Sequence, residues 1–212
     1  ITQETIEKLA VQYQSTAFPT IVREYVQHVF LAQLYRLPGA ENLLFKGGTA
    51  LRIIYGSPRF SEDLDFTLID ILPHSVKHTV EDMFVRVLAD SELMGMSVEL
   101  TNDSYETSGG YFGVALFHLF DYPPVGVEIN ISVRVSGEDR GEVDTISSDF
   151  ISTYNLVHLS QRSLVEEKIF GALLHRKKPR DFYDLYFMMR KNMLLPEQKK
   201  RLSEIKTDIS NE

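Results

Sequence analysis

The sequence predicts an α+β fold in which a small β-sheet is flanked by helices and followed by a C-terminal helical region. Short apolar or alternating segments, among them residues 43–45 and 125–135, have the length and period of β-strands. Longer segments, residues 18–36 and 75–91, repeat their apolar residues at helical spacing. With 212 residues, of which 43% are hydrophobic, the chain is large enough to bury one such core.

The first part of the chain is expected to place helices against the beginning of the sheet. Two helices, residues 2–14 and 18–36, are expected to cover the sheet, and Pro38 and Gly39 mark the end of the second. A strand, a glycine turn and a short helix then fill residues 42–54. Another strand is expected to pass through residues 63–66.

The later part is expected to complete the sheet and then become helical. Strands are predicted at residues 95–101, 110–120 and 125–135, the last two as a hairpin around residues 121–124. The polar residues 136–149 are expected to form a loop, which divides a sheet unit, residues 1–150, from a helical unit, residues 151–212. Helices are predicted there at residues 164–175, from Pro179 onward, and at residues 196–207.

Composition limits the classes of protein to which the chain can belong. The absence of cysteine excludes disulfides, thiolate zinc sites and a cysteine nucleophile, and it fits a reducing compartment. No apolar run is long enough to span a membrane, and the N-terminal residues lack the pattern of a signal peptide. We therefore expect a cytoplasmic protein without a membrane partner.

Charge is divided unevenly along the chain, although the net charge is −8. Residues 1–150 contain 10 basic and 22 acidic residues, whereas residues 151–212 contain 12 basic and 8 acidic residues. The basic C-terminal part can bind a polyanion such as RNA, or it can simply present a solvated helical face.

Gly47 and Gly48 connect a buried strand to a short helix. Glycine lets the backbone adopt conformations that are closed to residues with a Cβ. A helix that begins directly after such a pair presents free N–H groups to a phosphate. A glycine pair alone is often only a turn, so the interpretation depends on what lies beside it.

Asp63 and Asp65 flank Leu64 in the strand that follows. Because strand side chains alternate, Leu64 and Phe66 should enter the core while the two carboxylates point out of it together. Adjacent carboxylates repel one another unless a cation lies between them, and Mg²⁺ prefers such oxygen ligands together with phosphate. An Asp-x-Asp pair alone can be a solvated strand face, but next to the glycine turn it predicts a site for a nucleotide and a metal.

Glu128 lies in a segment, residues 126–134, that alternates between apolar and polar residues. If this strand neighbours the aspartate strand, Glu128 supplies a third carboxylate, and three carboxylates can serve two metal ions. The alternative is an exposed strand glutamate without a ligand.

Four segments together resemble a known family. FKGGTAL at residues 45–51, RFSEDLDF at 59–66, EK at 167–168 and RDFYDL at 180–185 are similar to motifs of the AbiEii/AbiGii toxin nucleotidyltransferases. This family belongs to the DNA polymerase β-like nucleotidyltransferase superfamily. The resemblance implies a small mixed sheet of the polymerase β palm type, flanked by helices.

The resemblance also implies roles for individual residues. Gly47, Gly48 and Thr49 would hold the triphosphate of an NTP, and Asp63 and Asp65 would bind Mg²⁺. Lys168 would contact the triphosphate, and Asp181 or Asp184 would lie near the active site, although Asp181 also suits the first turn of its helix. Further candidates around the phosphates are Lys46, Arg59 and Ser61, with Lys46 alternatively ending its strand.

The predicted activity is Mg²⁺-dependent transfer of a nucleoside monophosphate from an NTP to an acceptor hydroxyl. RNA is the expected acceptor, and family toxins are neutralised by an antitoxin. One or two Mg²⁺ ions and a general base, Asp65 or Glu128, would serve the reaction. Two alternatives remain: nucleotidylation of a small molecule or protein, and a nucleotide-binding module without turnover that acts through a partner.

Two other enzyme classes are excluded by missing motifs. The chain lacks the GxSxG of serine hydrolases and the HRD and DFG motifs of protein kinases.

Overall fold

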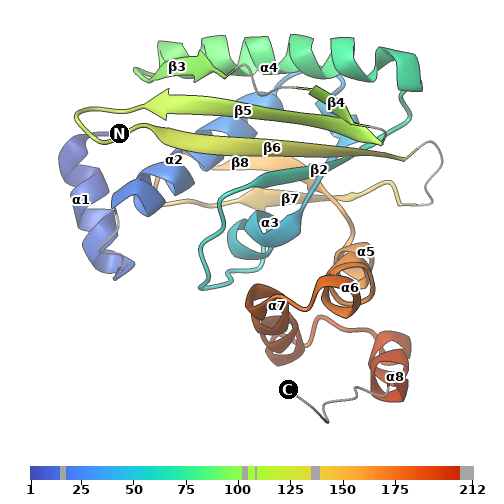
Figure 1. Ribbon diagram of the computed structural model, residues 1–212. Helices are drawn as coiled ribbons and strands as arrows, with labels where there is room; N and C mark the ends of the chain where they lie inside the picture. Colours follow the sequence, from blue (N-terminus) through green and yellow to red (C-terminus); the bar gives the residue numbers. More distant parts are fainter. Residues whose placement is uncertain (15–17, 102–104, 108, 135–138, 206–212) are drawn as a thin grey trace. The chain divides into compact units, whose positions relative to one another are not determined.

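The computed structural model describes residues 1–14, 18–101, 105–107, 109–134 and 139–205. Its contacts divide the chain into two compact units, Ile1–Leu159 and Ser160–Glu212. The first unit contains a sheet with helices, and the described part of the second is helical (Figure 1). The predicted α+β class is therefore confirmed.

The elements have the following bounds. The helices of the first unit are α1 (Gln3–Gln12), α2 (Phe18–Leu34), α3 (Gly47–Ile53) and α4 (Val76–Leu93). Its strands are β1 (Leu43–Lys46), β2 (Leu64–Ile69), β3 (Ser97–Leu100), β4 (Tyr105–Thr107), β5 (Gly110–His118), β6 (Val125–Arg134), β7 (Glu142–Ile146) and β8 (Tyr154–His158). The second unit contains α5 (Gln161–Glu166), a π-helical segment (Glu167–Leu173), α6 (Leu174–Arg176), α7 (Pro179–Arg190) and α8 (Pro196–Glu204).

The strands form one mixed sheet in the order β3-β5-β6-β2-β1-β8-β7, with β4 paired to β5. β2 runs parallel to β6 and β1 runs parallel to β8, while the other pairs are antiparallel. β5 and β6 form the predicted hairpin. The parallel pairing of β2 with β6 places the strand that carries Asp65 next to the strand that carries Glu128, as the predicted third carboxylate requires.

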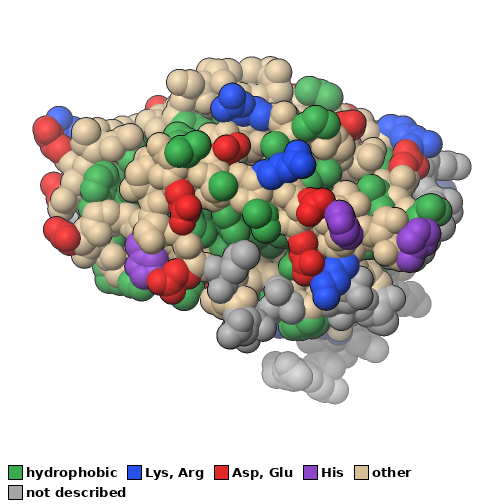
Figure 2. Space-filling view, turned by 90° about the horizontal axis from the view of Figure 1, so that it is seen from above, with side chains coloured by type: hydrophobic (Ala, Val, Ile, Leu, Met, Phe, Trp, Pro, Cys, Tyr) green, Lys and Arg blue, Asp and Glu red, His purple; other side chains and the backbone are tan. Residues whose placement is uncertain are grey.

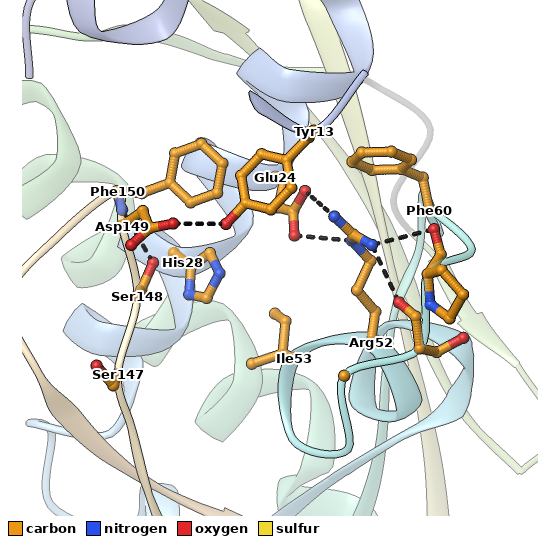
Figure 3. A pocket seen from close by; sticks show the side chains of 13 residues that line it. Tyr13, Glu24, His28, Arg52, Ile53, Phe60, Ser147, Ser148, Asp149 and Phe150 are labelled. Atoms are coloured by element: carbon orange, nitrogen blue, oxygen red, sulfur yellow. Dashed lines mark hydrogen bonds and ion pairs between the residues drawn. The ribbon is translucent and has the colours of Figure 1, made fainter. Parts of the chain in front are cut away.

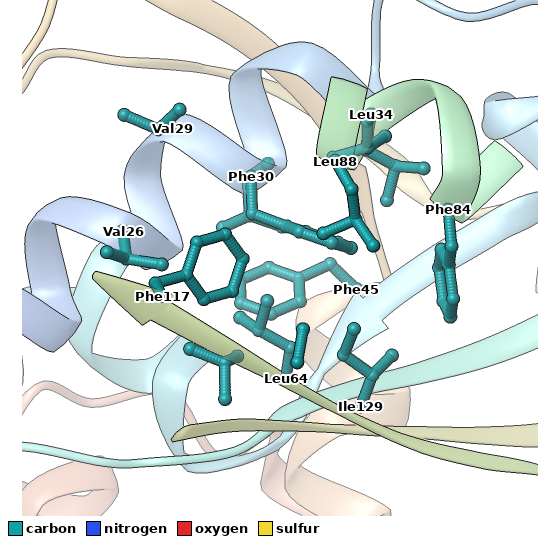
Figure 4. Close-up of a cluster of buried hydrophobic side chains, with 14 of the residues drawn as sticks. Val26, Val29, Phe30, Leu34, Phe45, Leu64, Phe84, Leu88, Phe117 and Ile129 are labelled. Atoms are coloured by element: carbon teal, nitrogen blue, oxygen red, sulfur yellow. The ribbon is translucent and has the colours of Figure 1, made fainter. Parts of the chain in front are cut away.

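One face of the sheet is buried beneath α2 and α4. Figure 4 shows hydrophobic side chains of both helices meeting those of the strands, including Phe45 of β1 and Leu64 of β2. Leu64 and Phe66 are fully buried, and the rings of Phe45 and Phe66 lie 5.5 Å apart. Because alternation sends Asp65 to the other face, the core fixes the side of the sheet on which the polar site can form.

The loop predicted at residues 136–149 is wrong for residues 142–146, which form β7 and pair with β8. Residues 135–138 lie outside the described residues. β7 is an edge strand with four of its five residues exposed, so its polar composition resembled that of a loop. The sheet unit continues through β8, and the division between the units falls between Leu159 and Ser160.

The outer surface of the first unit is mixed in character. Figure 2 shows acidic, basic and histidine side chains scattered among hydrophobic ones on the face seen from above Figure 1, without one dominant patch. Among the described residues, no helix has the length and apolar character needed to cross a membrane.

His28 of α2 is a buried titratable group in the first unit. Its Nδ1 shares a hydrogen bond of 2.8 Å with the Tyr154 hydroxyl, and its ring lies 5.5 Å from that of Phe150. Burial, helped by the charge of Arg52, lowers the pKa of His28 from 6.5 to about 4. The imidazole is therefore neutral in the folded protein at neutral pH.

This pKa shift predicts a loss of stability in acid. Between pH 6.5 and about 4 the unfolded chain binds a proton at His28 that the folded chain does not, so the free energy of unfolding decreases as pH falls, by up to about 3 kcal/mol. Urea unfolding of the wild type and His28→Gln should show a smaller decrease in the variant. The comparison between the two proteins is needed because burial also raises the pKa of Glu24. Exposed His78→Gln serves as control, and equal pH slopes in the wild type and His28→Gln contradict the prediction.

Candidate active site

β1 passes directly into α3 through Gly47 and Gly48. Gly47 has a φ of 84°, a left-handed conformation that strains any residue with a Cβ. The N-cap residue Lys46 makes no side-chain capping bond to α3. The Lys46 side chain therefore does not cap the first N–H groups of α3. The predicted phosphate site requires these groups to be available for hydrogen bonds to phosphate.

Asp65 packs directly against Gly47. The antiparallel register of β1 and β2 places Lys46 opposite Asp65. A Cβ built on Gly47 would lie 2.1 Å from Oδ2 of Asp65, so only glycine leaves room for the carboxylate. The residue predicted to bind metal therefore touches the turn predicted to hold phosphate.

Arg59 and Ser61 lie over the second glycine. A Cβ built on Gly48 would be 2.7 Å from both Nη2 of Arg59 and Oγ of Ser61. The segment between α3 and β2 therefore folds back onto the start of the helix. It brings a guanidinium and a hydroxyl, both predicted to contact nucleotide, to the same turn.

Thr49 and Asp63 connect α3 to the start of β2. The buried Thr49 hydroxyl donates a hydrogen bond to the backbone carbonyl of Asp63, so this side chain is committed to the fold. The carboxylate of Asp63 is half-buried and has no hydrogen-bond or ion-pair partner among the residues that the structure describes. Such an acceptor group beside Asp65 suits a cation.

β6 adds further polar groups to this face. Its parallel register places Asn130 opposite Asp65, and alternation puts Glu128 and Ser132 on the same side. Continuing the register by one residue places the exposed Glu128 level with Asp63. Sequence reasoning did not assign Asn130 to the site, although the alternation of residues 126–134 already placed it on the face of Glu128.

Lys46 extends across the same face of the sheet. Its Nζ donates a hydrogen bond of 2.9 Å to the Ser132 hydroxyl, which itself donates to the Phe66 carbonyl. The lysine therefore does more than end β1, because its ammonium group is held beside Asp65 on the polar face. Sequence reasoning also missed Ser132, the residue that holds it.

The described residues contain no group of three or more His, Cys, Asp or Glu side chains placed to hold a metal ion. A cation on Asp63 and Asp65 would complete its coordination with water and phosphate oxygens, which is how proteins commonly bind Mg²⁺. Glu128 stays a predicted third ligand.

The motif residues of the second unit form two internal ion pairs. Nζ of Lys168, in the π-helical segment, lies 2.8 Å from Oδ2 of Asp184 in α7, and both side chains are buried. Asp181 accepts three hydrogen bonds from Arg176, at 2.7, 2.9 and 3.2 Å, and one from the Lys178 N–H.

These pairs have clear structural roles. The bond from Arg176 is the main cause that lowers the pKa of Asp181, and the bond from Lys178 caps α7. The assignment of Lys168, Asp181 and Asp184 to the nucleotide site stays a prediction from the family resemblance. Arg176, which sequence reasoning did not single out, is the partner that keeps the buried Asp181 charged.

Comparison with known proteins agrees with these features. The sequence model of a family described as "Nucleotidyl transferase AbiEii toxin, Type IV TA system" matches residues 29–207, whereas no curated protein matches the chain. Two crystal structures from Helicobacter pylori, one described as a "putative nucleotidyltransferase" and the other as JHP933, share the fold with a TM-score of 0.59 and 22% identity. The alignments cover 86% of this chain and 74% and 72% of those chains.

The family match spans most of the chain, and the two structures support the same fold. The resemblance inferred from the FKGGTAL and RFSEDLDF segments is thereby confirmed. The chain belongs to the AbiEii family of nucleotidyl transferase toxins and is a nucleotidyltransferase.

Proposed function

We propose that this enzyme transfers a nucleoside monophosphate from an NTP to a hydroxyl of an RNA acceptor, with Mg²⁺ held by Asp63 and Asp65. The observation that carries the proposal is the contact of Asp65 with Gly47, which joins a carboxylate site to a phosphate-binding turn. Nucleotidyl transfer needs these two features side by side, because its catalysis consists mainly of positioning and charge neutralisation.

The residues present fit a magnesium ion. The carboxylate of Asp63, directly before β2, has no protein partner among the described residues, and that of Asp65, in β2, is half-buried. Bound there, Mg²⁺ would neutralise charge on the triphosphate oxygens. Glu128 is the further candidate ligand, and Glu128 or Asp65 is the candidate base that accepts the proton of the acceptor hydroxyl.

The cationic groups beside the glycine turn would serve the phosphates. Arg59 lies over Gly48, and Lys46 is held on the same face as Asp65. In these positions their charges would stabilise the pyrophosphate as it leaves. The hydroxyl of Ser61 can donate a hydrogen bond to a phosphate oxygen, whereas Thr49 would contribute through its backbone N–H.

An exposed aromatic surface on α7 supports RNA as the acceptor. We define this α7 surface by four side chains of the helix that are at least 38% exposed: Phe182, Tyr183, Tyr186 and Met189. The Arg190 guanidinium lies 5.8 Å from the Tyr186 ring centre and donates to its hydroxyl. Exposed rings beside cations are the groups on which single-stranded RNA bases stack.

The family also implies a partner protein. Its description as a type IV toxin–antitoxin system supports an antitoxin that opposes the enzyme. Because NTPs and RNA are cytoplasmic molecules, we place the reaction in the cytoplasm.

Radiolabelled NTP offered with RNA, protein or small-molecule acceptors distinguishes the proposal from nucleotidylation of other acceptors. NTP binding without any product would indicate a nucleotide-binding module without turnover.

Removing either aspartate charge should abolish transfer. Asp63→Asn and Asp65→Asn should each lower the rate of label transfer from NTP by about 100-fold or more, because the metal loses a charged ligand. Circular dichroism and thermal unfolding should stay close to those of the wild type. EDTA should have the same effect on the wild type, and added Mg²⁺ should reverse it.

The neighbouring Glu62→Gln is the matched control for these variants. Glu62 is an exposed carboxylate that pairs with Arg23 at 3.2 Å, and its loss should leave transfer nearly unchanged. Full activity in Asp63→Asn and Asp65→Asn would reject the metal site.

Gly47→Ala should remove activity beyond its cost in stability. Its Cβ would displace the Asp65 carboxylate, and the positive φ adds strain of about 1 kcal/mol. Gly95→Ala has a similar φ of 88° and open space around the added Cβ, so it should lose comparable stability but keep transfer activity. Equal transfer rates in the two variants would show that the contact between Gly47 and Asp65 does not matter for catalysis.

Loss of a ring from the α7 surface should weaken acceptor binding alone. We expect Tyr186→Ala to raise the KM for RNA about 10-fold, as loss of one stacked base does, without changing the KM for NTP. Tyr105→Ala in β4 removes an equally exposed tyrosine from the first unit and should change neither value. An unchanged KM for RNA in Tyr186→Ala would remove the α7 surface from the acceptor site.

A further inference from the structure

The first unit contains a cavity of about 400 Å³ that is separate from the glycine turn. The end of α1, α2, the C-terminal end of α3 with the segment after it, and residues 147–150 border the cavity. Figure 3 shows side chains from these elements arranged around an open space, with Arg52 on one side and His28 on the other. We call it the Arg52 cavity.

The charge of Arg52 is already fully matched. Its Nε and Nη2 donate to the two carboxylate oxygens of Glu24 at 2.8 and 2.9 Å, and its Nη1 donates to the carbonyls of Ser57 and Pro58. Both charged side chains are almost completely buried. The cavity therefore offers no unpaired arginine charge to an anion such as phosphate.

Aromatic rings form much of the remaining wall. The Phe60 ring centre lies 3.8 Å from the Arg52 guanidinium carbon, and the Tyr13 ring centre lies 5.7 Å from it. The rings of Tyr13 and Phe150 are nearly parallel, 16° apart in angle, with centres at 6.1 Å. A cavity bordered by these rings favours a flat ligand, which gains contact with them at low entropic cost.

Several polar groups at the cavity can orient an uncharged ligand. Nδ1 of His28 is used by Tyr154, which leaves Nε2 of a neutral ring. Asp149 accepts hydrogen bonds from Gln12 and Tyr13 on Oδ2 alone, so Oδ1 keeps its capacity to accept a donor. Ser57 also borders the cavity, but its hydroxyl oxygen is fully buried, so this hydroxyl is not among the groups offered to a ligand.

We propose that the Arg52 cavity binds a small, flat, uncharged nitrogen heterocycle of the nucleobase or nucleoside class, at a site distinct from that of the NTP triphosphate. Its volume falls within the range of small-molecule sites. A nucleobase carries both the amino donors that suit Asp149 and the ring acceptors or donors that suit His28. Phosphate would add nothing, because the cavity has a surplus carboxylate and no unpaired arginine.

The position of the cavity gives this ligand a route to the active site. Ser57, Pro58 and Phe60 border the cavity, while Arg59 and Ser61 from the same segment lie over Gly48. A ligand that contacts this segment therefore holds the residues proposed to meet the triphosphate. The site is regulatory in this sense, and it goes beyond the transfer reaction itself.

Isothermal titration of the whole chain with adenosine, guanosine, cytidine and uridine tests the proposal without requiring turnover. At least one nucleoside should bind, and its affinity should be unchanged in Asp65→Asn. Asp149→Ala, which removes the acceptor, and Ile53→Trp, which fills the cavity, should each weaken binding at least 10-fold. The exposed Glu92→Ala in α4 is the matched control for carboxylate removal and should bind like the wild type.

Three results would overturn the proposal. One is the absence of binding by all four nucleosides at millimolar concentration. Another is binding that is lost in Asp65→Asn but kept in Asp149→Ala, which would place the ligand at the NTP site. The third is markedly tighter binding of the nucleoside 5′-monophosphate, which would make the ligand an anion. Thermal unfolding of each variant checks that it is folded, and Asp149→Ala decides the question if Ile53→Trp does not fold.

Discussion

The close approach of the Asp65 carboxylate to the Cα of Gly47 is the constraint on which the candidate site depends. A Cβ at Gly47 would lie within 2.1 Å of the carboxylate, and the φ of 84° at this residue already disfavours any side chain. Strand pairing enforces the contact, because the register places Lys46 opposite Asp65. The turn proposed to bind phosphate and the strand proposed to bind metal are consequently in direct contact in the folded chain.

The two faces of the sheet explain why polar groups gather where they do. Phe45, Phe66 and Ile131 face α2 and α4, and the residues that alternate with them must face the other way. Each strand therefore contributes a polar group at the same level: Lys46 from β1, Asp65 from β2 and Asn130 from β6. A one-residue slip in any of these pairings would bury a charge and expose the core, so burial of the apolar face also protects the site.

Buried ion pairs have a different role in this protein from that proposed for the half-buried carboxylate of Asp63. Lys168 with Asp184, Asp181 with Arg176 and Glu24 with Arg52 each satisfy a buried charge that would otherwise be costly. The motif residues Lys168, Asp181 and Asp184 thus stabilise the second unit, in addition to any role in the reaction. Asp63 differs from them, since its carboxylate has no protein partner among the described residues.

Local periodicity and short motifs are sufficient to predict the α+β class, the glycine turn, the outward direction of Asp65 and the family. The order of the strands becomes visible only in the folded chain, and with it the placement of Asn130 beside Asp65 and the hydrogen bond from Lys46 to Ser132. The tertiary structure also shows that polar residues 142–146 are an edge strand rather than a loop, and that the segment after α3 returns to Gly48. These features depend on pairing and packing between residues that are distant in the chain. Neither hydrophobic periodicity nor amino-acid composition predicts such contacts.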